Sequence, residues 1–332
     1  MLPRRSRGAT SRRSTRDRVL AGGPRLPGVR TATTIAELRG ALDAERCAGR
    51  TVGLVPTMGY LHDGHVSLIE RAAAENDVVV TTIFVNPLQF AAGEDLDTYP
   101  RDPEGDAAKA SAAGAAWLFL PDLEEMYPDG RDGVLTGVSV QALSSVMEGA
   151  SRRTHFGGVC TVVAKLFNIV GPCRAYFGEK DYQQLAIVRR MAADLSAPVE
   201  VIGCPIVREP DGLAMSSRNV YLTDPERATA PVLRRALLTG ASLIRSGETD
   251  AERVRAAVAA VIDAAPHGEL DYVEVADPAT LAPLDVADET SRLFAAVRFG
   301  RARLIDNLSA GDDVAVGGPG GDAPAAAPGP AT

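Results

Sequence analysis

Two histidines three residues apart lie in the stretch LVPTMGYLHDGHVSLIERA (54–72), in a chain that has only four histidines. An apolar, strand-like run leads into a turn containing Gly59, and an amphipathic run begins near Gly64. This order predicts that His62 and His65 lie at the start of a helix. The first turn of a helix presents unpaired N–H groups and a partial positive charge, so it suits an anion such as a phosphate.

The histidine pair also fits other kinds of chemistry. Proton transfer by imidazole is one of them. A zinc site would need further ligands at suitable spacing, and the chain has neither an HExxH pattern nor a cluster of Cys and His residues. Two polar side chains that only cap a helix would be a purely structural explanation. The sequence favours phosphate binding and leaves the capping role open.

Three further polar motifs have spacings that suit ligand binding. IFVNPLQF places the amides of Asn86 and Gln89 directly after a strand-like run, where they can hydrogen-bond hydroxyls and carboxylates. FGEKDYQQL combines a strand end, a glycine and a helix start, with Lys180 as a point charge for phosphate and Gln184 one turn later. DGLAMSSRN places two serines and Arg218 on an expected loop. Each motif alone also fits a solvated polar segment.

Acidic residues follow IFVNPLQF in the segment GEDLDTYPRD (93–102), and Asp106 comes shortly after them. Carboxylates in such a segment can hold Mg²⁺ through water. A solvated acidic loop explains the same residues equally well. Asp106 is therefore a candidate residue for Mg²⁺ that accompanies a nucleotide.

The elements that would position these motifs alternate between strand and helix from residue 51 to residue 207. The continuous β-branched run VVVTTIFV is typical of a parallel strand that helices cover on both faces. Strand–helix alternation predicts βαβ units and a parallel sheet, which binds ligands at one edge. Strands are expected at 51–55, 78–85, 117–120, 175–178 and 199–207, and helices at 64–75, 102–114, 158–170 and 180–195.

After residue 208 the pattern changes to helices at 225–246 and 249–264 and strands at 270–276, 292–298 and 301–306. The predicted fold class is therefore α/β, a Rossmann-like parallel sheet with flanking helices, plus a smaller C-terminal α+β domain. The turn-rich boundary suggests that the second domain acts as a lid. The expected division is a disordered Arg-rich extension (1–30), a catalytic domain (31–207), a C-terminal lid domain (208–308) and a disordered tail (309–332).

Charge is distributed unevenly along the chain. Residues 1–30 carry nine arginines and one aspartate, a net charge of +8; the chain total is −8, so residues 31–332 carry −16. An acidic core argues against nucleic acid as a partner. The chain contains no run of 18 apolar residues, so no membrane span is expected. Four scattered cysteines fit a reduced, cytoplasmic protein.

Taken in order, the motifs resemble a known family. H-x-G-H after a strand is similar to the signature of the nucleotidylyltransferase superfamily, which includes class I aminoacyl-tRNA synthetases, and the loop with Arg218 resembles its K-M-S-K-S loop. The series P-T-M-G-x-L-H-x-G-H, F-V-N-P-x-Q-F, T-H-F-x-G-V, F-G-E-K-D-x-Q-Q and G-L-A-M-S-S-R-N resembles the pantothenate synthetases, or pantoate–β-alanine ligases, over residues 31–308. This resemblance implies ATP-dependent condensation of (R)-pantoate with β-alanine to pantothenate, AMP and pyrophosphate through a pantoyl adenylate.

The resemblance also implies roles for individual residues. His65, His62, Lys180 and Arg218 are the expected catalytic residues. The expected ATP-binding residues lie in four segments and are Pro56, Thr57, Met58, Gly59, Tyr60, Leu61, His62, Asp63, Gly64, His65, Gly178, Glu179, Lys180, Asp181, Val207, Met215, Ser216, Ser217 and Arg218.

For the other ligands, the resemblance implies that Gln89 and Gln184 bind pantoate and that Gln89 also meets β-alanine. Asn86, Arg152 and His155 are expected as walls of the site. Mg²⁺ is expected to bridge the ATP phosphates, with Asp106 in an outer shell. Gly105 stands where a further carboxylate would be expected, so this segment offers few acidic ligands for Mg²⁺. The family is typically a homodimer.

Two alternatives remain at this stage. Another adenylate-forming or cytidylyl-transferring enzyme of the superfamily would share H-x-G-H. A tRNA synthetase would need a tRNA-binding domain, which an acidic C-terminal part of about 100 residues does not suggest. A nucleotide-binding module without catalysis could lack some of the four expected catalytic residues, and all four are present.

Overall fold

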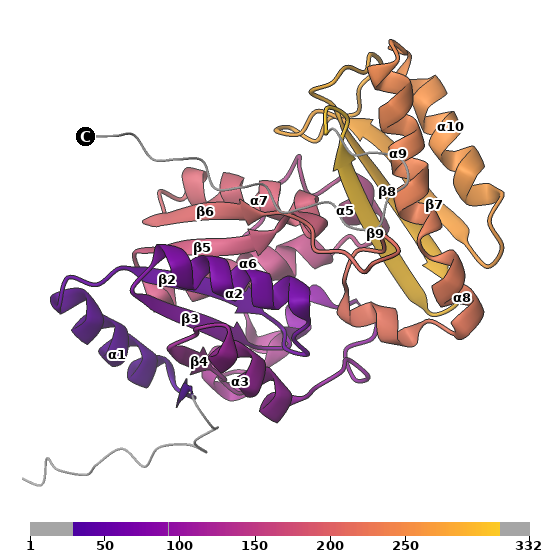
Figure 1. Cartoon of the computed structure of the whole chain (residues 1–332). Coiled ribbons are helices and arrows are strands. Elements are labelled where there is room, and N and C mark those ends of the chain that lie inside the picture. Colours follow the sequence, from indigo (N-terminus) through magenta and orange to yellow (C-terminus); the bar gives the residue numbers. More distant parts are fainter. Residues whose placement is uncertain (1–28, 92, 313–332) are drawn as a thin grey trace, which may run out of the picture.

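Two separate β-sheets organise the chain in the computed structural model, which describes residues 29–91 and 93–312 (Figure 1). The strands of the first sheet are β1 (Arg30–Ala32), β2 (Val52–Thr57), β3 (Val78–Ile83), β4 (Trp117–Phe119), β5 (Cys173–Gly178) and β6 (Val199–Cys204). They lie in the order β1-β4-β3-β2-β5-β6, and every neighbouring pair is parallel. The predicted parallel sheet is confirmed.

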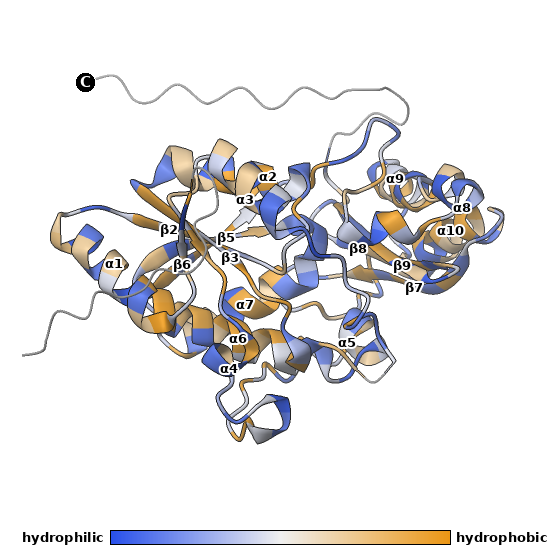
Figure 2. Cartoon of the chain, turned by 90° about the horizontal axis from the view of Figure 1, so that it is seen from below, coloured by the Kyte–Doolittle hydropathy of each residue, from blue (hydrophilic) through white to orange (hydrophobic). Residues whose placement is uncertain are grey.

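Helices cover both faces of this sheet (Figure 2). On one face lie α1 (Ile35–Cys47), α6 (His155–Val170) and α7 (Tyr182–Asp194), and on the other lie α2 (Asp63–Glu75) and α3 (Pro103–Ala112). The central strands β2 and β3 are buried almost throughout, which explains their continuous apolar sequences. Short helical segments complete this part: α4 (Leu123–Met126), α5 (Met147–Ser151), and the 3₁₀ turns η1 (Pro87–Gln89), η2 (Arg131–Gly133) and η3 (Glu179–Asp181).

The second sheet is antiparallel, with β8 between β7 and β9. The second domain, which contains this sheet, consists of η4 (Ser217–Tyr221), α8 (Asp224–Thr229), α9 (Val232–Arg245), α10 (Ala251–Asp263), β7 (Glu269–Ala276), β8 (Arg292–Phe299) and β9 (Ala302–Ser309). Leu293 and Val297 of β8 belong to the core formed with α9 and α10. Side chains alternate between the faces of a strand, so Arg292 and Phe294 face the other way. Phe294 packs with Met147 of the first domain. The predicted smaller α+β domain is confirmed.

Some element boundaries differ from the sequence-based expectation. The helix expected at 225–246 is two helices, because Pro231 lacks an N–H and its ring clashes with the preceding turn. Helix α6 begins at His155, three residues earlier than expected, and β1, α1 and α5 were not predicted. Arg30 belongs to β1 and Ser309 to β9, so the expected extensions are shorter than 1–30 and 309–332. Val29 and residues 310–312 are also described, and residues 1–28 and 313–332 lie outside the described residues.

Within residues 29–91 and 93–312, no helix combines the length and the apolar character that are needed to traverse a bilayer.

Candidate active site

A cavity of about 210 Å³ opens at the carboxyl ends of β2 and β5. From β2 the sheet continues through β3 and β4 on one side and through β5 and β6 on the other, so the order of the strands reverses at β2. Ligands of open parallel sheets bind at such a switch point. Sixteen of the expected site residues line this cavity: Pro56, Thr57, Met58, His62, Gly64, His65, Gln89, Gly178, Lys180, Asp181, Gln184, Val207, Met215, Ser216, Ser217 and Arg218.

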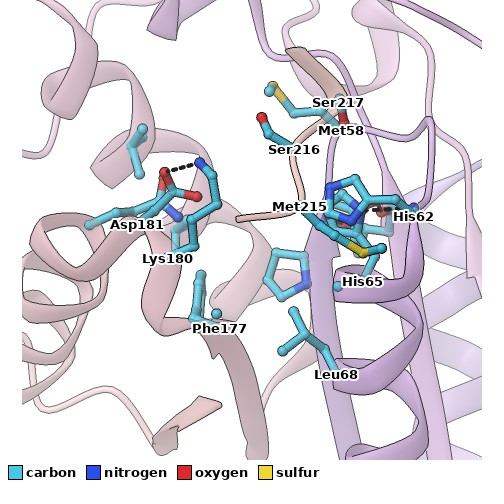
Figure 3. A pocket seen from close by; sticks show the side chains of 18 of the residues that line it. Met58, His62, His65, Leu68, Phe177, Lys180, Asp181, Met215, Ser216 and Ser217 are labelled. Carbon is cyan, nitrogen blue, oxygen red and sulfur yellow. Dashed lines mark hydrogen bonds and ion pairs between the residues drawn. The ribbon is translucent and has the colours of Figure 1, made fainter. Parts of the chain in front are cut away.

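The two histidines form one wall of the cavity, at the start of α2 (Figure 3). His62 is the N-cap residue, and the ring centroids of His62 and His65 lie 4.1 Å apart. The backbone N–H of His62 donates to Nδ1 of His65 at 3.4 Å. Because Nδ1 of His65 accepts, a neutral His65 ring carries its proton on Nε2.

Both rings are neutral at pH 7. Burial lowers the pKa of His62 to about 4, with the charge of Lys180 acting in the same direction. Burial and the neighbouring His62 lower the pKa of His65 to about 3. The pair therefore acts as hydrogen-bonding imidazoles and not as two standing charges.

Lys180 lies across the cavity from the histidines (Figure 3). Its ammonium contacts Oδ1 of Asp181 at 3.4 Å. Burial alone would raise the pKa of Asp181, but the charges of Lys180 and Arg218 outweigh it and hold that pKa below its usual value. The cavity thus has neutral donors on one wall and a cation beside a carboxylate on the other.

Asp106 builds the turn before the histidines and does not line the cavity. Its carboxylate is buried and accepts the N–H groups of Tyr60 at 2.8 Å and Leu61 at 2.6 Å. Gly59 has a φ of +88°, and a Cβ there would lie 2.9 Å from Oδ2 of Asp106. Lys109 supports the same turn by donating to the carbonyl of Leu61 at 2.6 Å. Asp106 is thereby engaged with the backbone.

The described residues do not provide a metal site. Nowhere in 29–91 or 93–312 do three or more His, Cys, Asp or Glu side chains come together in a group that could hold an ion. With the carboxylate of Asp106 turned to the backbone, the residues do not fit a protein-held Mg²⁺.

Gln89 is held by a buried amide network behind the cavity. Nδ2 of Asn86 donates to Oε1 of Gln89 at 3.1 Å, and the hydroxyl of Tyr127 donates to Oδ1 of Asn86 at 2.8 Å. These bonds leave Nε2 of Gln89 directed to Sδ of Met58, at 2.9 Å. Asn86 lies outside the cavity lining and orients Gln89 from behind.

Helix α6 packs directly on the backbone of this segment. Gly158 approaches so closely that a Cβ there would lie 2.3 Å from the carbonyl carbon of Leu88. The carbonyl of Gly158 accepts from Nδ2 of Asn86 at 3.1 Å. The glycine in T-H-F-x-G-V is therefore required by close packing.

A second, larger cavity of about 920 Å³ adjoins the first, between the two sheets. Lys180, Gln89 and Arg218 line both cavities. Arg152 and His155 line only the larger one, where Arg152 Nη2 donates to the carbonyl of Gln89 at 3.3 Å and His155 Nδ1 lies 3.0 Å from it. The larger cavity therefore gives a second approach to Gln89.

The loop 215–218 closes one side of the first cavity. Arg218 makes a two-pronged pair with Asp95, with Nε–Oδ2 and Nη2–Oδ1 both at 3.2 Å. Ser217 Oγ donates to the carbonyl of Tyr60 at 3.4 Å, and the N–H of Arg218 donates to Oγ of Ser216 at 3.2 Å. The loop thus contacts the turn that precedes the histidines.

Sequence reasoning included some residues that do not line either cavity and missed others that do. Gly59, Tyr60, Leu61, Asp63 and Glu179 belong to the adjoining turns but are not part of the linings. In the smaller cavity the missed lining residues are mainly apolar: Leu68, Phe84, Tyr99, Val159, Val162, Val163, Leu166 and Phe177. In the larger cavity they are mainly polar or charged and include Glu148, Gln183, Asp271, Arg301, Arg303 and Asn307. Asp95 was considered only as part of an acidic loop. Apolar residues of a strand or helix carry no signal that separates a cavity wall from a core.

Comparison with known proteins gives a consistent result. A family model described as pantoate-beta-alanine ligase matches residues 30–309. A pantothenate synthetase of Roseiflexus sp. (strain RS-1) is 53% identical over 279 residues, covering 84% of this chain and 98% of that protein. One of Thermus thermophilus is 54% identical over 281 residues, covering 84% and 99%.

Solved structures agree with the sequence matches. A pantothenate synthetase from Thermus thermophilus superposes with a TM-score of 0.80 at 53% identity, covering 85% of this chain and 99% of that one. A pantoate-beta-alanine ligase from Francisella tularensis, described as complexed with beta-gamma ATP and beta-alanine, gives a TM-score of 0.69 at 32% identity, covering 86% and 98%.

Proposed function

The chain belongs to the pantoate–β-alanine ligase family, and from this premise we propose how its pocket carries out the reaction. The enzyme is an ATP-dependent ligase that joins (R)-pantoate to β-alanine and forms pantothenate, AMP and pyrophosphate. The carboxylate of pantoate attacks the α-phosphorus of ATP and pyrophosphate leaves. The amine of β-alanine then attacks the acyl carbon of the adenylate, and AMP leaves. Because the anhydride is itself a good electrophile, no nucleophile of the protein is needed.

One observation carries the assignment of ATP to the smaller cavity. Two neutral imidazoles at a helix start face a lysine across the switch point of a parallel sheet. The proposed ATP site comprises 56–65, 178–181, Val207 and 215–218. In it, His65 donates from Nε2 to the α-phosphate and His62 contacts the phosphates. Lys180 and Arg218 meet the charge that develops as pyrophosphate departs.

We propose that pantoate binds at Gln89 and Gln184, which both line the ATP cavity. Their amides can pair with hydroxyls and a carboxylate without adding charge. β-Alanine meets Gln89 from the larger cavity, where Arg152 and His155 contact the Gln89 carbonyl. The Francisella tularensis ligase, described as complexed with beta-gamma ATP and beta-alanine, supports the binding of both kinds of ligand.

Three further assignments belong to this proposal. Mg²⁺ arrives bound to the triphosphate, because the described residues offer no ligand set of their own. The enzyme works in the cytoplasm, which the four free cysteines support. It is a homodimer, as the family resemblance implies, and sedimentation equilibrium of the purified chain measures this directly.

A coupled assay for AMP tests the function. AMP should form at a steady rate only when ATP, pantoate and β-alanine are all present. ATP with pantoate alone should release at most one equivalent of pyrophosphate per site. Glycine in place of β-alanine and CTP in place of ATP serve as matched controls. Equal rates with glycine would contradict the β-alanine assignment. CTP would yield CMP and not AMP, so its reaction is followed by pyrophosphate release, and equal rates with CTP would favour a cytidylyl transfer instead.

A further inference from the structure

The turn that carries Lys180 is held by side chains of the second domain. Asn307 lies on β9 and is only 2% exposed. Its Nδ2 donates to the carbonyl of Glu179 at 2.9 Å and to the carbonyl of Lys180 at 3.0 Å. An amide nitrogen has two hydrogens, so both donors of Asn307 are used on this one turn.

Arg292 of β8 completes the contact. Phe294 of β8 pairs with Asn307 of β9, so Asn307 and Arg292 lie on the same face of the sheet. Arg292 Nε donates to Oδ1 of Asn307 at 2.7 Å, and Nη2 pairs with Oε2 of Glu179 at 3.1 Å. Its guanidinium carbon also lies 3.6 Å from the ring centroid of Tyr182. Because Oδ1 accepts from Arg292, the orientation of the Asn307 amide is determined.

The turn itself has little regular structure to fix it. Only three residues form η3, and Asp181, the N-cap of α7, has φ −97° and ψ 57° and makes no side-chain capping bond. The Lys180 side chain makes a single ion pair within the turn, with Asp181. A lysine on such a turn reaches a fixed point only if its backbone is fixed by other contacts.

We propose that Asn307, oriented by Arg292, is a positioning residue that sets the place of Lys180 for adenylate formation. The inference rests on the phosphate role proposed above for Lys180. It gives the second domain a role in adenylate formation that is separate from the role of its loop 215–218. Asn307 lines the larger cavity, but its side-chain amide is used by the two carbonyls of the turn and by Arg292, so it acts on Lys180 through the backbone of the turn.

The experiment is a double-mutant cycle read by pantoate-dependent exchange of radiolabelled pyrophosphate into ATP. Asn307→Asp keeps the size of the side chain but places a carboxylate against two carbonyl oxygens. It should reduce exchange about 10- to 100-fold, because small misplacements of a catalytic group cost factors of this size. Lys180 and Asn307 also line the larger cavity, so the KM for β-alanine is measured alongside, and it should change by a smaller factor than exchange does.

In a Lys180→Ala background, Asn307→Asp should lower exchange by less than about 3-fold, because the group it positions is gone. The proposal would be overturned if the fold reduction in the double variant equalled the product of the two single reductions. Wild-type exchange in Asn307→Asp alone would also overturn it. Asn168→Asp, the same change on an exposed position of α6, is the matched control and should leave exchange unchanged.

A second variant keeps the test decisive if Asn307→Asp loses its circular dichroism signal. Arg292→Lys keeps the charge but cannot donate to Asn307 and Glu179 together. It should reduce exchange by several-fold in the wild-type background and by much less in Lys180→Ala. If the wild-type enzyme itself shows no pantoate-dependent exchange, the proposed function fails; if it exchanges and the cycle is multiplicative, only the positioning role fails.

Discussion

Two segments bring a cation to the same cavity, and they are held in opposite ways. The turn η3 carries Lys180 and is fixed by buried donors from Asn307 and Arg292. The loop 215–218 carries Arg218, whose guanidinium pairs with Asp95. That pair is part-exposed, with 29% of the Arg218 side chain and 24% of the Asp95 side chain accessible.

We propose that this difference gives the two cations different tasks. A part-exposed ion pair contributes about 1 kcal/mol or less, so an incoming phosphate can displace the carboxylate of Asp95 from Arg218. Among the residues that the structure describes, Lys180 has no ion-pair partner to exchange beyond its neighbour Asp181. Lys180 is therefore preorganised by the fold, whereas Arg218 reaches the ligand by changing partners.

The largest expected effect comes from the fixed side. Lys180→Ala should reduce pantoate-dependent pyrophosphate exchange by about 10²- to 10³-fold, the range seen when one oriented stabilising donor is removed. Circular dichroism and melting temperature should stay near wild type, because the side chain makes only one ion pair, at 3.4 Å. Lys165→Ala on α6, whose ammonium lies over Tyr127, is the control. If Lys180→Ala kept more than a third of the wild-type exchange rate, a residue other than Lys180 would supply the positive charge to the phosphates.

Acid pH probes the partly buried imidazoles of His62 and His65, which face Lys180, and of His155 in the larger cavity. Burial lowers the pKa values of His62 and His155 to about 4 and that of His65 to about 3. The unfolded chain binds protons near pH 6.5, and the folded chain does not. The stability they contribute is complete above pH 6.5 and is lost as the pH falls toward 4, by at most about 3 kcal/mol per histidine.

Urea unfolding at pH 7, 6 and 5 measures this loss. The free energy of unfolding should fall steadily over the series. In His155→Gln its slope against pH should correspond to nearly one fewer proton taken up on unfolding. An identical slope in His155→Gln and wild type would show that His155 does not stay neutral in the folded state.

On the exchangeable side, Arg218→Lys should lower kcat/KM for ATP about 10-fold, since an ammonium cannot reproduce the two-pronged geometry of a guanidinium. The melting temperature should hardly change, because the ion pair is part-exposed. A large fall in melting temperature would mean that Arg218 is structural, as Arg292 is, and would remove the contrast between the two segments.

The smallest expected effect is an improvement. Asp95→Asn removes the partner from which Arg218 must be released, so the KM for ATP should fall by up to about 5-fold at low salt. The gain should shrink as salt rises, because screening already weakens the pair. Asp194→Asn, which removes another exposed ion pair, with Arg190 on α7, is the matched control. A higher KM for ATP in Asp95→Asn would show that Asp95 helps to place Arg218 for the ligand.

Much of the architecture was accessible from the sequence, for a physical reason. The continuous β-branched runs and the glycines at strand ends report local geometry, and they placed His62, Lys180 and Gln89 at one sheet edge. The break at Pro231 carried a clear signal that was not used.

The remaining features depend on contacts between distant parts of the chain. Asn307 and Lys180 are 127 residues apart, and the strand sequence ARLIDNLS does not indicate which distant residue Asn307 contacts. Asp106 illustrates the same limit. A carboxylate that looks suited to a metal on sequence grounds is committed to the N–H groups of a turn 45 residues earlier.

The bond between Asn307 and the Lys180 turn also has a consequence for synthesis of the chain. The ribosome releases the six-stranded sheet well before β9, and domains that emerge first fold first. A nascent chain that ends before residue 307 contains both histidines and the lysine, yet it lacks the donors that fix the turn. Under the proposed positioning role, the nucleotide site is completed only after β9 has been synthesised, so chains that end before β9 activate pantoate more slowly than chains that contain it.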